Sequence, residues 1–296
     1  MTTKERTDIY QRITDQIAEA IERGAGTYKM PWHTSGEFGF SPINAQSGRP
    51  YRGINVLVLW SEAEKRGFSS GLWATYKQWS DLGAQVRRGE KATAVVFWKF
   101  SQVQTKAEDS EEESEKSIPF AREYSVFNSD QVTGFKSDEA KPVLSESERV
   151  EGAEQFFSSL GAEIRTGGNR AFYSSDADLI WVPNFSAFRN GTAYYSVLAH
   201  ETTHWTGAPH RLNRDMSHRF GSEAYAVEEL VAELGAAFVC ADLGLTHEPR
   251  TDHAAYIASW LKALRNDKRA IFTASSKAQA AVDWMHSQQG EGRAAA

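Results

Sequence analysis

Residues 192–206 read TAYYSVLAHETTHWT, and this stretch decides the fold of the C-terminal half of the chain. Apolar and aromatic residues recur in it at helical spacing, and Gly207 and Pro209 follow as signals that end a helix. The letters HETTH place two histidines four residues apart, so that both rings lie on one face of the helix. The stretch therefore predicts a helix that presents His200 and His204 to one common point.

The spacing HExxH on a helix is typical of a zinc-peptidase site. Zn²⁺ accepts imidazole nitrogen readily and polarises the water bound to it, so we predict that His200 and His204 are metal ligands. Glu201 lies about 100° around the helix from His200, since one turn takes about 3.6 residues. There it can accept a proton from the attacking water and later pass it to a leaving amine, which makes Glu201 the predicted catalytic residue.

Two candidates compete for the third ligand. The string from His200 to His210 reads HETTHWTGAPH and fits the pattern HExxHxxGxxH, in which His210 is a ligand. The rival is Glu229, within the apolar helical stretch 223–243, because a buried carboxylate there is costly unless a cation pairs with it. Glu233, one turn further on, is then placed to brace a ligand histidine. The residues favour Glu229 and leave His210 open.

The rest of the C-terminal half alternates short strands with helices. Strand patterns fall at 163–165, 170–173 and 178–182, and helical patterns at 146–160, 192–206, 223–243, 251–266 and 267–289. Strands followed by helices indicate an α+β fold. Arg211, His218 and Tyr225 are weaker candidates for contact with a substrate or an oxyanion.

The N-terminal half has a different character. It contains helical patterns at 6–23, 55–66 and 75–82, a turn-rich stretch at 24–52, and strand patterns at 92–103 and 124–128. Between those strands, residues 101–117 carry few apolar and many acidic side chains, which predicts a flexible acidic loop. We therefore predict two domains, 1–135 and 136–296, the first a small α+β domain.

The net charge of −6 is unevenly distributed. Residues 1–100 carry 14 Lys and Arg against 10 Asp and Glu, so a polyanion would bind there. The 296 residues include a single cysteine, Cys240, which excludes an internal disulfide and a cysteine-based zinc ribbon. No apolar stretch is long enough to span a bilayer, and the first residues do not resemble a secretion signal. These features predict a cytoplasmic protein without a membrane partner.

Aromatic residues alternate with basic and small polar ones throughout the N-terminal half. Exposed rings stack on bases while cations meet phosphates, so this mixture favours single-stranded nucleic acid bound without sequence preference. The alternative is a core that contains several tryptophans. The predicted DNA-binding residues are Trp32, Tyr51, Arg52, Asn55, Trp73, Tyr76, Lys77, Arg87, Arg88 and Lys91.

Three separated motifs extend this prediction to a family. The stretches PINAQSGRPYRGINVLVLW, WATYKQWSDLGAQVRRGEKATAVVFW and HETTHWTGAPHRLNRD occur in this order. They resemble ArdC-type antirestriction proteins of conjugative plasmids over nearly the whole chain. The resemblance implies an N-terminal domain that binds single-stranded DNA, a C-terminal zincin-like metallopeptidase domain, and protection of incoming plasmid DNA from host restriction. It also favours the downstream glutamate over His210 as third ligand.

The function that we predict is therefore that of a plasmid antirestriction protein with a zinc metallopeptidase site. Its expected partners are single-stranded DNA, with double-stranded DNA as an alternative, and a protein substrate or a component of the host restriction system. The expected cofactor is Zn²⁺, and another divalent metal stays open. Two other functions compete: a non-catalytic DNA-binding protein with a structural metal, and a regulatory metalloprotease that uses DNA as a scaffold.

Overall fold

The structure is a computed structural model and describes residues 8–26, 30–33, 41–106, 113–135, 145–216, 222–247 and 253–290. The chain divides into two compact units that interleave along the sequence. Unit 1 consists of residues 1–42, 50–71 and 137–296, and unit 2 of residues 43–49 and 72–136. No helix among the described residues is both long and apolar enough to cross a membrane.

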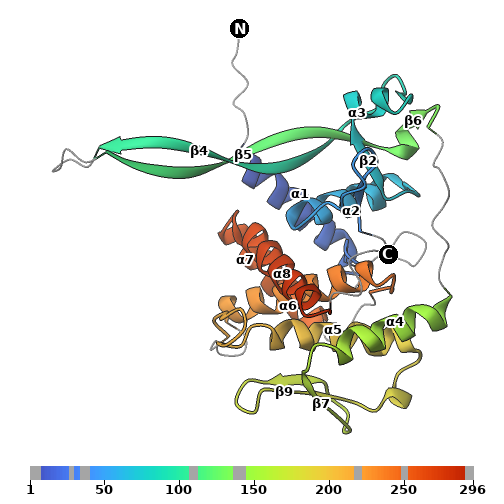
Figure 1. The fold of residues 1–296 in the computed structure, drawn as a ribbon, viewed down its shortest axis with the longest axis vertical. Helices are drawn as coiled ribbons and strands as arrows, with labels where there is room; N and C mark the ends of the chain where they lie inside the picture. Colours follow the sequence, from blue (N-terminus) through green and yellow to red (C-terminus); the bar gives the residue numbers. More distant parts are fainter. Residues whose placement is uncertain are drawn as a thin grey trace. The chain divides into compact units, whose positions relative to one another are not determined.

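Four helices form the core of unit 1 (Figure 1). Helix α6 (Glu223–Asp242) is central and packs against α5 (Gly191–Trp205), α7 (His253–Asn266) and α8 (Ala270–Ser287). Most of α6 from Leu230 onward is buried, which explains why its sequence is apolar on nearly all sides rather than on one stripe. Helix α4 (Glu146–Ser158) packs on α5.

A close approach of α5 and α6 depends on a glycine. A Cβ built on Gly235 of α6 would lie 2.5 Å from Cγ2 of Thr203 on α5, which is too close for any real side chain. Glycine at this position lets the two backbones come together and sets the distance between the histidine face of α5 and the carboxylates of α6. Thr203 is fully buried where the two helices meet.

A three-stranded sheet lies against α5 in unit 1. Its order is β7 (Glu163–Thr166), β9 (Leu179–Val182), β8 (Phe172–Ser174), with β7 parallel and β8 antiparallel to β9. Among the described strands, β8 therefore has a neighbour on one side. A short 3₁₀ turn, η2 (Phe185–Ala187), leads from β9 to α5. Strands and helices occur close to the predicted positions, and the α+β fold class is confirmed.

The helices α1 (Ile9–Gly24) and α2 (Ile54–Arg66) belong to unit 1 although they come early in the chain. Their apolar faces pack on each other, and α1 also packs on α7 and α2 on α8. The predicted boundary after residue 135 lies near the last passage from unit 2 to unit 1. Packing, however, joins α1 and α2 to the C-terminal elements, because these elements cover their apolar side chains.

Unit 2 is built on a four-stranded sheet in the order β1 (Ile43–Asn44), β2 (Leu72–Thr75), β5 (Glu113–Asn128), β4 (Thr93–Lys106). Helix α3 (Tyr76–Asp81) follows β2 through a capping box at Thr75 and packs against β2 and β5. A second pair joins β3 (Gln85–Val86) and β6 (Val132–Thr133), which follows the turn η1 (Ser129–Gln131). The small core of this unit centres on Trp79 with Ala74, Ala84, Val86 and Val132.

Strands β4 and β5 form a long two-stranded ribbon that continues beyond the small sheet (Figure 1). Their pairing runs from Thr93 opposite Val126 to Lys106 opposite Glu113. The prediction of a flexible loop over 101–117 is therefore wrong except for residues 107–112, which lie outside the described residues. A two-stranded ribbon needs backbone pairing rather than a buried side-chain face, so polar residues are compatible with it.

Candidate metal centre

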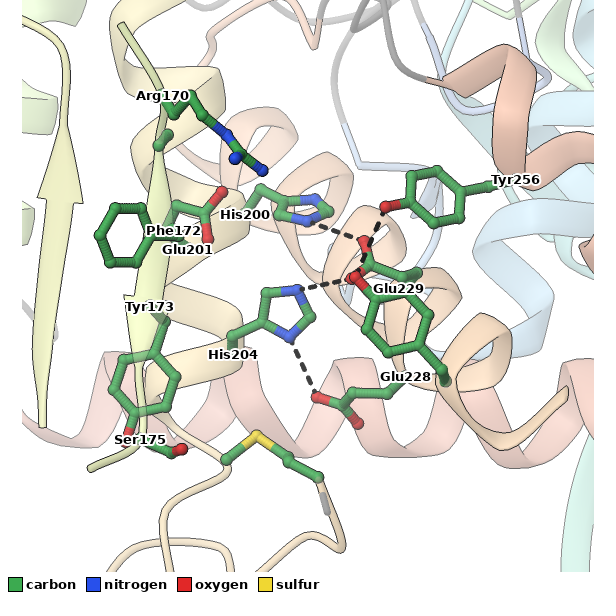
Figure 2. A pocket seen from close by; sticks show the side chains of 13 residues that line it. Arg170, Phe172, Tyr173, Ser175, His200, Glu201, His204, Glu228, Glu229 and Tyr256 are labelled. Carbon is green, nitrogen blue, oxygen red and sulfur yellow. Dashed lines mark hydrogen bonds and ion pairs between the residues drawn. The ribbon is translucent and has the colours of Figure 1, made fainter. Parts of the chain in front are cut away.

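Helix α5 carries both predicted histidine ligands on one face. Asn190 caps its start by accepting a hydrogen bond from the backbone N–H of Ala193. One turn apart near the other end, His200 and His204 have ring centroids 4.9 Å apart at an interplanar angle of 77°. Both rings point towards α6, as Figure 2 shows.

Helix α6 supplies three carboxylates to the same place. Glu228, Glu229 and Glu233 are buried, with exposed fractions of 8%, 8% and 0%. Buried carboxylates on a core helix are costly unless cationic or hydrogen-bonding groups surround them. Each of the three carboxylates makes a different contact with the two histidines.

Glu229 faces the Nε2 atoms of both rings (Figure 2). Its Oε2 lies 3.5 Å from Nε2 of His200, and its Oε1 lies 3.7 Å from Nε2 of His204. One ligand atom from each residue falls within 4.8 Å of the others. Ligands about 2.0–2.1 Å from a tetrahedral Zn²⁺ are roughly 3.3 Å apart, so these spacings fit one cation bound between the three side chains.

The other nitrogen of each ring faces a second carboxylate. Nδ1 of His204 lies 3.3 Å from Oε1 of Glu228, and Nδ1 of His200 lies 3.5 Å from Oε2 of Glu233. Metal-bound histidines almost always donate the remaining N–H to such a group, which fixes the tautomer and the ring orientation. Glu228 and Glu233 therefore direct both Nε2 lone pairs towards Glu229. This is the donor set, two nitrogens and one oxygen, that suits a catalytic zinc-type centre.

The electrostatics of the cluster keep its carboxylates ionised. Burial alone would raise the pKa of Glu229, but the hydrogen bond from His200 and the charges of His204 and His200 lower the pKa to about 2. Burial likewise opposes ionisation of Glu228, and the contacts with His204 and Arg214 outweigh it and lower its pKa. The negative charge of these ionised carboxylates attracts metal cations to the site.

Arg214 is the buried cation that compensates Glu228. Its Nη2 donates to Oε1 of Glu228 at 2.9 Å, and its Nη1 donates to Thr206 Oγ1 at 2.8 Å. The guanidinium also donates to the backbone carbonyl of Thr203 at the end of α5. Arg214 thus connects the end of α5 to α6 behind His204.

Replacing Arg214 with Met is expected to destabilise the metal-free chain by about 3 kcal/mol, because it leaves the Glu228 charge buried with one partner fewer. The measurement is chemical denaturation followed by fluorescence. The matched control is Arg165→Met, which removes an exposed pair with Glu163 and is expected to cost less than about 1 kcal/mol. Equal losses in the two variants would show that Arg214 carries no special electrostatic role.

Glu201 lies next to His200 and is 4% exposed. It lines the same cavity of about 310 Å³ as His200, His204 and Glu229. The wall across the cavity from Glu229 comes from strand β8 and the residues beside it, including Phe172 and Tyr173 (Figure 2). The predicted catalytic carboxylate and the three predicted ligands therefore share one pocket with an edge strand.

Two tyrosines complete the α6 side of the pocket. Tyr225 hydrogen-bonds to Glu229, and its hydroxyl oxygen lies 3.4 Å from that of Tyr256. Burial raises the pKa of Tyr225 strongly, and the bonds to Tyr256 and Glu229 raise it further, so the phenol stays protonated and able to donate. The sequence indicated Tyr225 but not Tyr256 or Arg170, which also lines the pocket. Neither residue belongs to a motif, and their positions depend on tertiary packing.

His210 does not join the cluster. Its ring is 63% exposed, and its Nε2 lies 3.2 Å from Oδ2 of Asp178 and 2.6 Å from Nη1 of Arg211. Arg211 pairs with Asp178 and lies over the ring of Trp205, so it supports the turn after α5 instead of facing the pocket. The geometry thus supports Glu229 rather than His210 as the third ligand. His218 lies outside the described residues.

Four of the predicted DNA-binding residues are buried, which corrects the expectation that their side chains meet bases. Trp32 is 0% exposed, Trp73 1%, Asn55 6% and Tyr51 7%. A ring enclosed on both faces cannot stack on a base. These residues belong to the cores of the two units, the alternative explanation for an aromatic-rich sequence.

The other predicted DNA-binding residues are exposed. Tyr76 is 52% exposed on α3, and Lys77 beside it pairs with Asp81. Arg52 belongs to unit 1 and pairs with Asp283. The remaining three, in unit 2, are Arg87, Arg88 and Lys91. Phe97 and Trp98 on β4, which the prediction did not include, are also 46% and 42% exposed. Their position in an apolar strand pattern predicted buried side chains.

Comparison with known proteins assigns both parts of the chain to known families. Residues 151–277 match the family model of a zincin-like metallopeptidase, and residues 7–127 match that of the N-terminal domain of anti-restriction factor ArdC. The metal-free crystal structure of the antirestriction ArdC protein from plasmid R388 is 39% identical. It superposes with a TM-score of 0.78 over 95% of this chain and 97% of that one. The chain belongs to the ArdC-type antirestriction family.

Other ArdC-type relatives extend the comparison. The Mn(II)-bound structure of the R388 protein is 37% identical, with a TM-score of 0.77 over 97% of this chain and all of that one. An uncharacterised protein, y4eC of Sinorhizobium fredii, is 52% identical over 98% of this chain and 95% of its own length. A DNA primase TraC of Escherichia coli is 36% identical over 93% of this chain, which corresponds to 27% of the primase. Sequence similar to nearly all of this chain therefore occurs both as nearly a whole protein and as part of a longer one.

Proposed function

We propose that this ArdC-type protein binds single-stranded DNA through unit 2, carries a metal-dependent peptidase centre in unit 1, and protects incoming conjugative DNA from host restriction. The observation that carries the catalytic part is the convergence of His200, His204 and Glu229 beside Glu201. The Mn(II)-bound structure of a related ArdC protein supports the presence of a divalent metal. We propose Zn²⁺ as the cofactor, since two imidazoles and one carboxylate suit it, and Mn²⁺ as the alternative.

The residues of the pocket have separable roles in hydrolysis. His200, His204 and Glu229 would hold the cation, which supplies Lewis acidity and lowers the pKa of a water molecule. Glu201 accepts a proton from the attacking water and returns it to the leaving amine. Tyr225 and Tyr256, both on the wall that holds Glu229, would donate hydrogen bonds to the developing oxyanion by giving up the bonds that their hydroxyls make in the free protein.

Strand β8 indicates the shape of the substrate. It pairs with β9 on one side, and Phe172 and Tyr173 from it line the pocket. An extended peptide can add to such an edge as a further strand, with its backbone held by the strand and its side chains in the pocket. We therefore propose an unfolded or extended protein segment as substrate, either from the host restriction system or from another protein that meets the transferred DNA.

A structural metal is the weaker alternative. Structural zinc sites have four protein ligands and no open position. Among the described residues, the cluster around the Nε2 atoms offers three ligands, and it opens into the cavity that Glu201 lines. A regulatory protease scaffolded on DNA would share this geometry, and its difference from our proposal lies in the protein that is cut.

The proposed DNA contact uses the ribbon and the basic residues of unit 2. Phe97 and Trp98 are neighbours on β4, so their side chains project to opposite faces. Phe97 packs edge-on against Tyr124 with centroids 5.4 Å apart, and Arg122 lies over the Tyr124 ring. On the Phe97 face, these rings beside a guanidinium provide stacking surfaces for bases and a cation for phosphate, and on the other face Trp98 provides a further exposed ring. Arg87, Arg88 and Lys91 add exposed positive charge to the same unit.

Replacing Trp98 with Ala is expected to weaken binding of single-stranded DNA about tenfold, because stacking of one base contributes roughly 1–3 kcal/mol. Binding to an oligonucleotide of mixed sequence is measured by fluorescence anisotropy at several salt concentrations. Affinity is expected to fall steeply with salt for both proteins, since phosphate contacts release counterions.

Phe185→Ala is the matched control for this experiment, because it removes a ring that is 49% exposed in unit 1. Its DNA affinity is expected to equal that of the wild type. A flat salt dependence, or equal losses in Trp98→Ala and Phe185→Ala, would contradict the proposed surface. Tighter binding of a duplex than of a single strand would make double-stranded DNA the partner.

A further inference from the structure

A second buried cluster lies directly behind the metal centre, within unit 1. It contains Trp32 and His33 from the N-terminal part of the chain, His247 from the segment after α6, and Glu233. All four side chains are nearly inaccessible, with exposed fractions of 0%, 4%, 2% and 0% in the same order. Two neighbouring residues from the start of the chain thus reach a carboxylate about 200 positions later.

The contacts of Glu233 divide between its two oxygens. Oε1 accepts a hydrogen bond from Nε1 of Trp32 at 3.1 Å and lies 2.9 Å from Nε2 of His33 and 2.9 Å from Nε2 of His247. Oε2 is turned to the metal centre and lies 3.5 Å from Nδ1 of His200. The three contacts on Oε1 therefore fix the direction in which Oε2 points.

The protonation pattern can be worked out from the backbone. Nδ1 of His33 accepts the N–H of Met30 at 2.9 Å, within a tight turn. A neutral imidazole that accepts at Nδ1 carries its proton on Nε2, so His33 donates to Glu233. His247 is held at its other nitrogen by the hydroxyl of Ser196, 2.8 Å away. Trp32 is a donor in every state.

This pattern decides against a second metal site, although the ligand atoms of His33, Glu233 and His247 are close enough for one. A cation on Nε2 of His33 would move the ring proton to Nδ1, where it would oppose the N–H of Met30. The N–H of Trp32 also points at the oxygen that such a cation would need. Trp32 and His33 therefore both donate to the one oxygen that a second cation would need.

We propose that Trp32 and His33 are positioning residues of the metal centre, and this inference rests on the proposed role of His200 as a ligand. With His247 they clamp Glu233 in place, so that its Oε2, at the ion-pair distance of 3.5 Å from Nδ1 of His200, would favour the ring proton on Nδ1 and leave Nε2 for the cation. The N-terminal segment thereby controls how strongly a metal binds to residues of the C-terminal half. A buried carboxylate without this clamp would turn or take up a proton, and the orientation of His200 would be lost.

The test measures Zn²⁺ affinity of full-length variants by competition with a chelating dye. Trp32→Phe keeps the ring and removes the N–H, and His33→Leu removes the second donor. Each is expected to weaken Zn²⁺ binding about tenfold, at the lower end of the range for residues behind the ligands. His33→Gln restores a donor near Nε2 and is expected to recover most of the affinity.

Trp79→Phe is the matched control. It removes a buried tryptophan N–H that donates at 2.9 Å to the carbonyl of Phe127, in unit 2. It is expected to lower stability much as Trp32→Phe does and to leave Zn²⁺ affinity unchanged. Equal affinities of wild type, Trp32→Phe and His33→Leu would overturn the inference, as would a second equivalent of tightly bound Zn²⁺ that disappears in His33→Leu.

A second measurement separates this inference from the metal centre itself. Nitrogen-15 NMR of histidine-labelled, metal-free protein reports which ring nitrogen of His200 carries the proton. Because Glu229 also attracts a ring proton to Nε2 in the metal-free protein, the expected result is relative: the Nδ1–H signal of His200 is weaker in Trp32→Phe than in the wild type and unchanged in Trp79→Phe. An unchanged tautomer would overturn the clamp even if Zn²⁺ binds. A protein in which His200 carries its proton on Nδ1 but Zn²⁺ does not bind would refute the metal centre. The proposed positioning of Glu233 by Trp32 and His33 would still hold.

Discussion

Glu201→Gln is expected to reduce peptide cleavage by the metal-loaded protein about 1000-fold, while metal affinity stays within about twofold of the wild type. A positioned general base contributes roughly 10²–10⁴ to such a reaction, and the amide cannot accept the proton of the attacking water. Glu201 lines the pocket next to His200 but is not among the three grouped ligands, so the cation does not depend on it. Cleavage of an unstructured protein is followed by gel electrophoresis, and metal content by elemental analysis.

Glu163→Gln serves as the control, because this carboxylate is exposed and pairs with Arg165 on β7. Its cleavage rate is expected to match the wild type. Undiminished cleavage by Glu201→Gln would contradict the assigned role of Glu201. Glu201→Gln can also be tested in cells. The efficiency of plasmid transfer into a restricting recipient shows whether protection from restriction needs the carboxylate of Glu201. Retained protection would make DNA binding, rather than hydrolysis, the basis of antirestriction.

Glu229→Gln is expected to weaken metal binding by more than about 100-fold, because the amide lacks the charge that both Nε2 atoms face. Residues behind the ligands account for roughly 10–100-fold, and a ligand itself contributes more. His210→Gln is the matched comparison and is expected to bind metal like the wild type, since its ring lies beside Asp178. Competition with a chelating dye measures both affinities. A large loss in His210→Gln with none in Glu229→Gln would reverse the ligand assignment.

The C-terminal fold was largely predictable because its signals are local. Helical periodicity and a following glycine or proline gave 192–206 where the structure has α5 at Gly191–Trp205, and 223–243 where it has α6 at Glu223–Asp242. The site follows from the same regularity. Two histidines one turn apart require a third donor, and an acidic pair on an apolar helix is costly unless it meets cations.

What could not be predicted depends on contacts between distant residues. Trp32 and Tyr76 stand in similar surroundings in the sequence, yet the first is enclosed beside Glu233 and the second is 52% exposed. Nothing local distinguishes them, because the partner of Trp32 lies 201 positions away. The outer part of the ribbon was missed for a related reason: pairing of β4 with β5 there is a property of two backbones, and polar side chains at 101–106 do not reveal it.

The interleaving of the two units has a consequence for how such chains evolve. Since α1, α2 and the Trp32–His33 turn complete the packing around α6, recombination that joined the first half of one relative to the second half of another would mismatch a shared interior. We therefore expect both halves of the chain to be transferred together when genes recombine. The match to a primase TraC runs over 293 residues, across both halves, although it occupies only 27% of that protein. The part of that primase that resembles this chain thus includes both units.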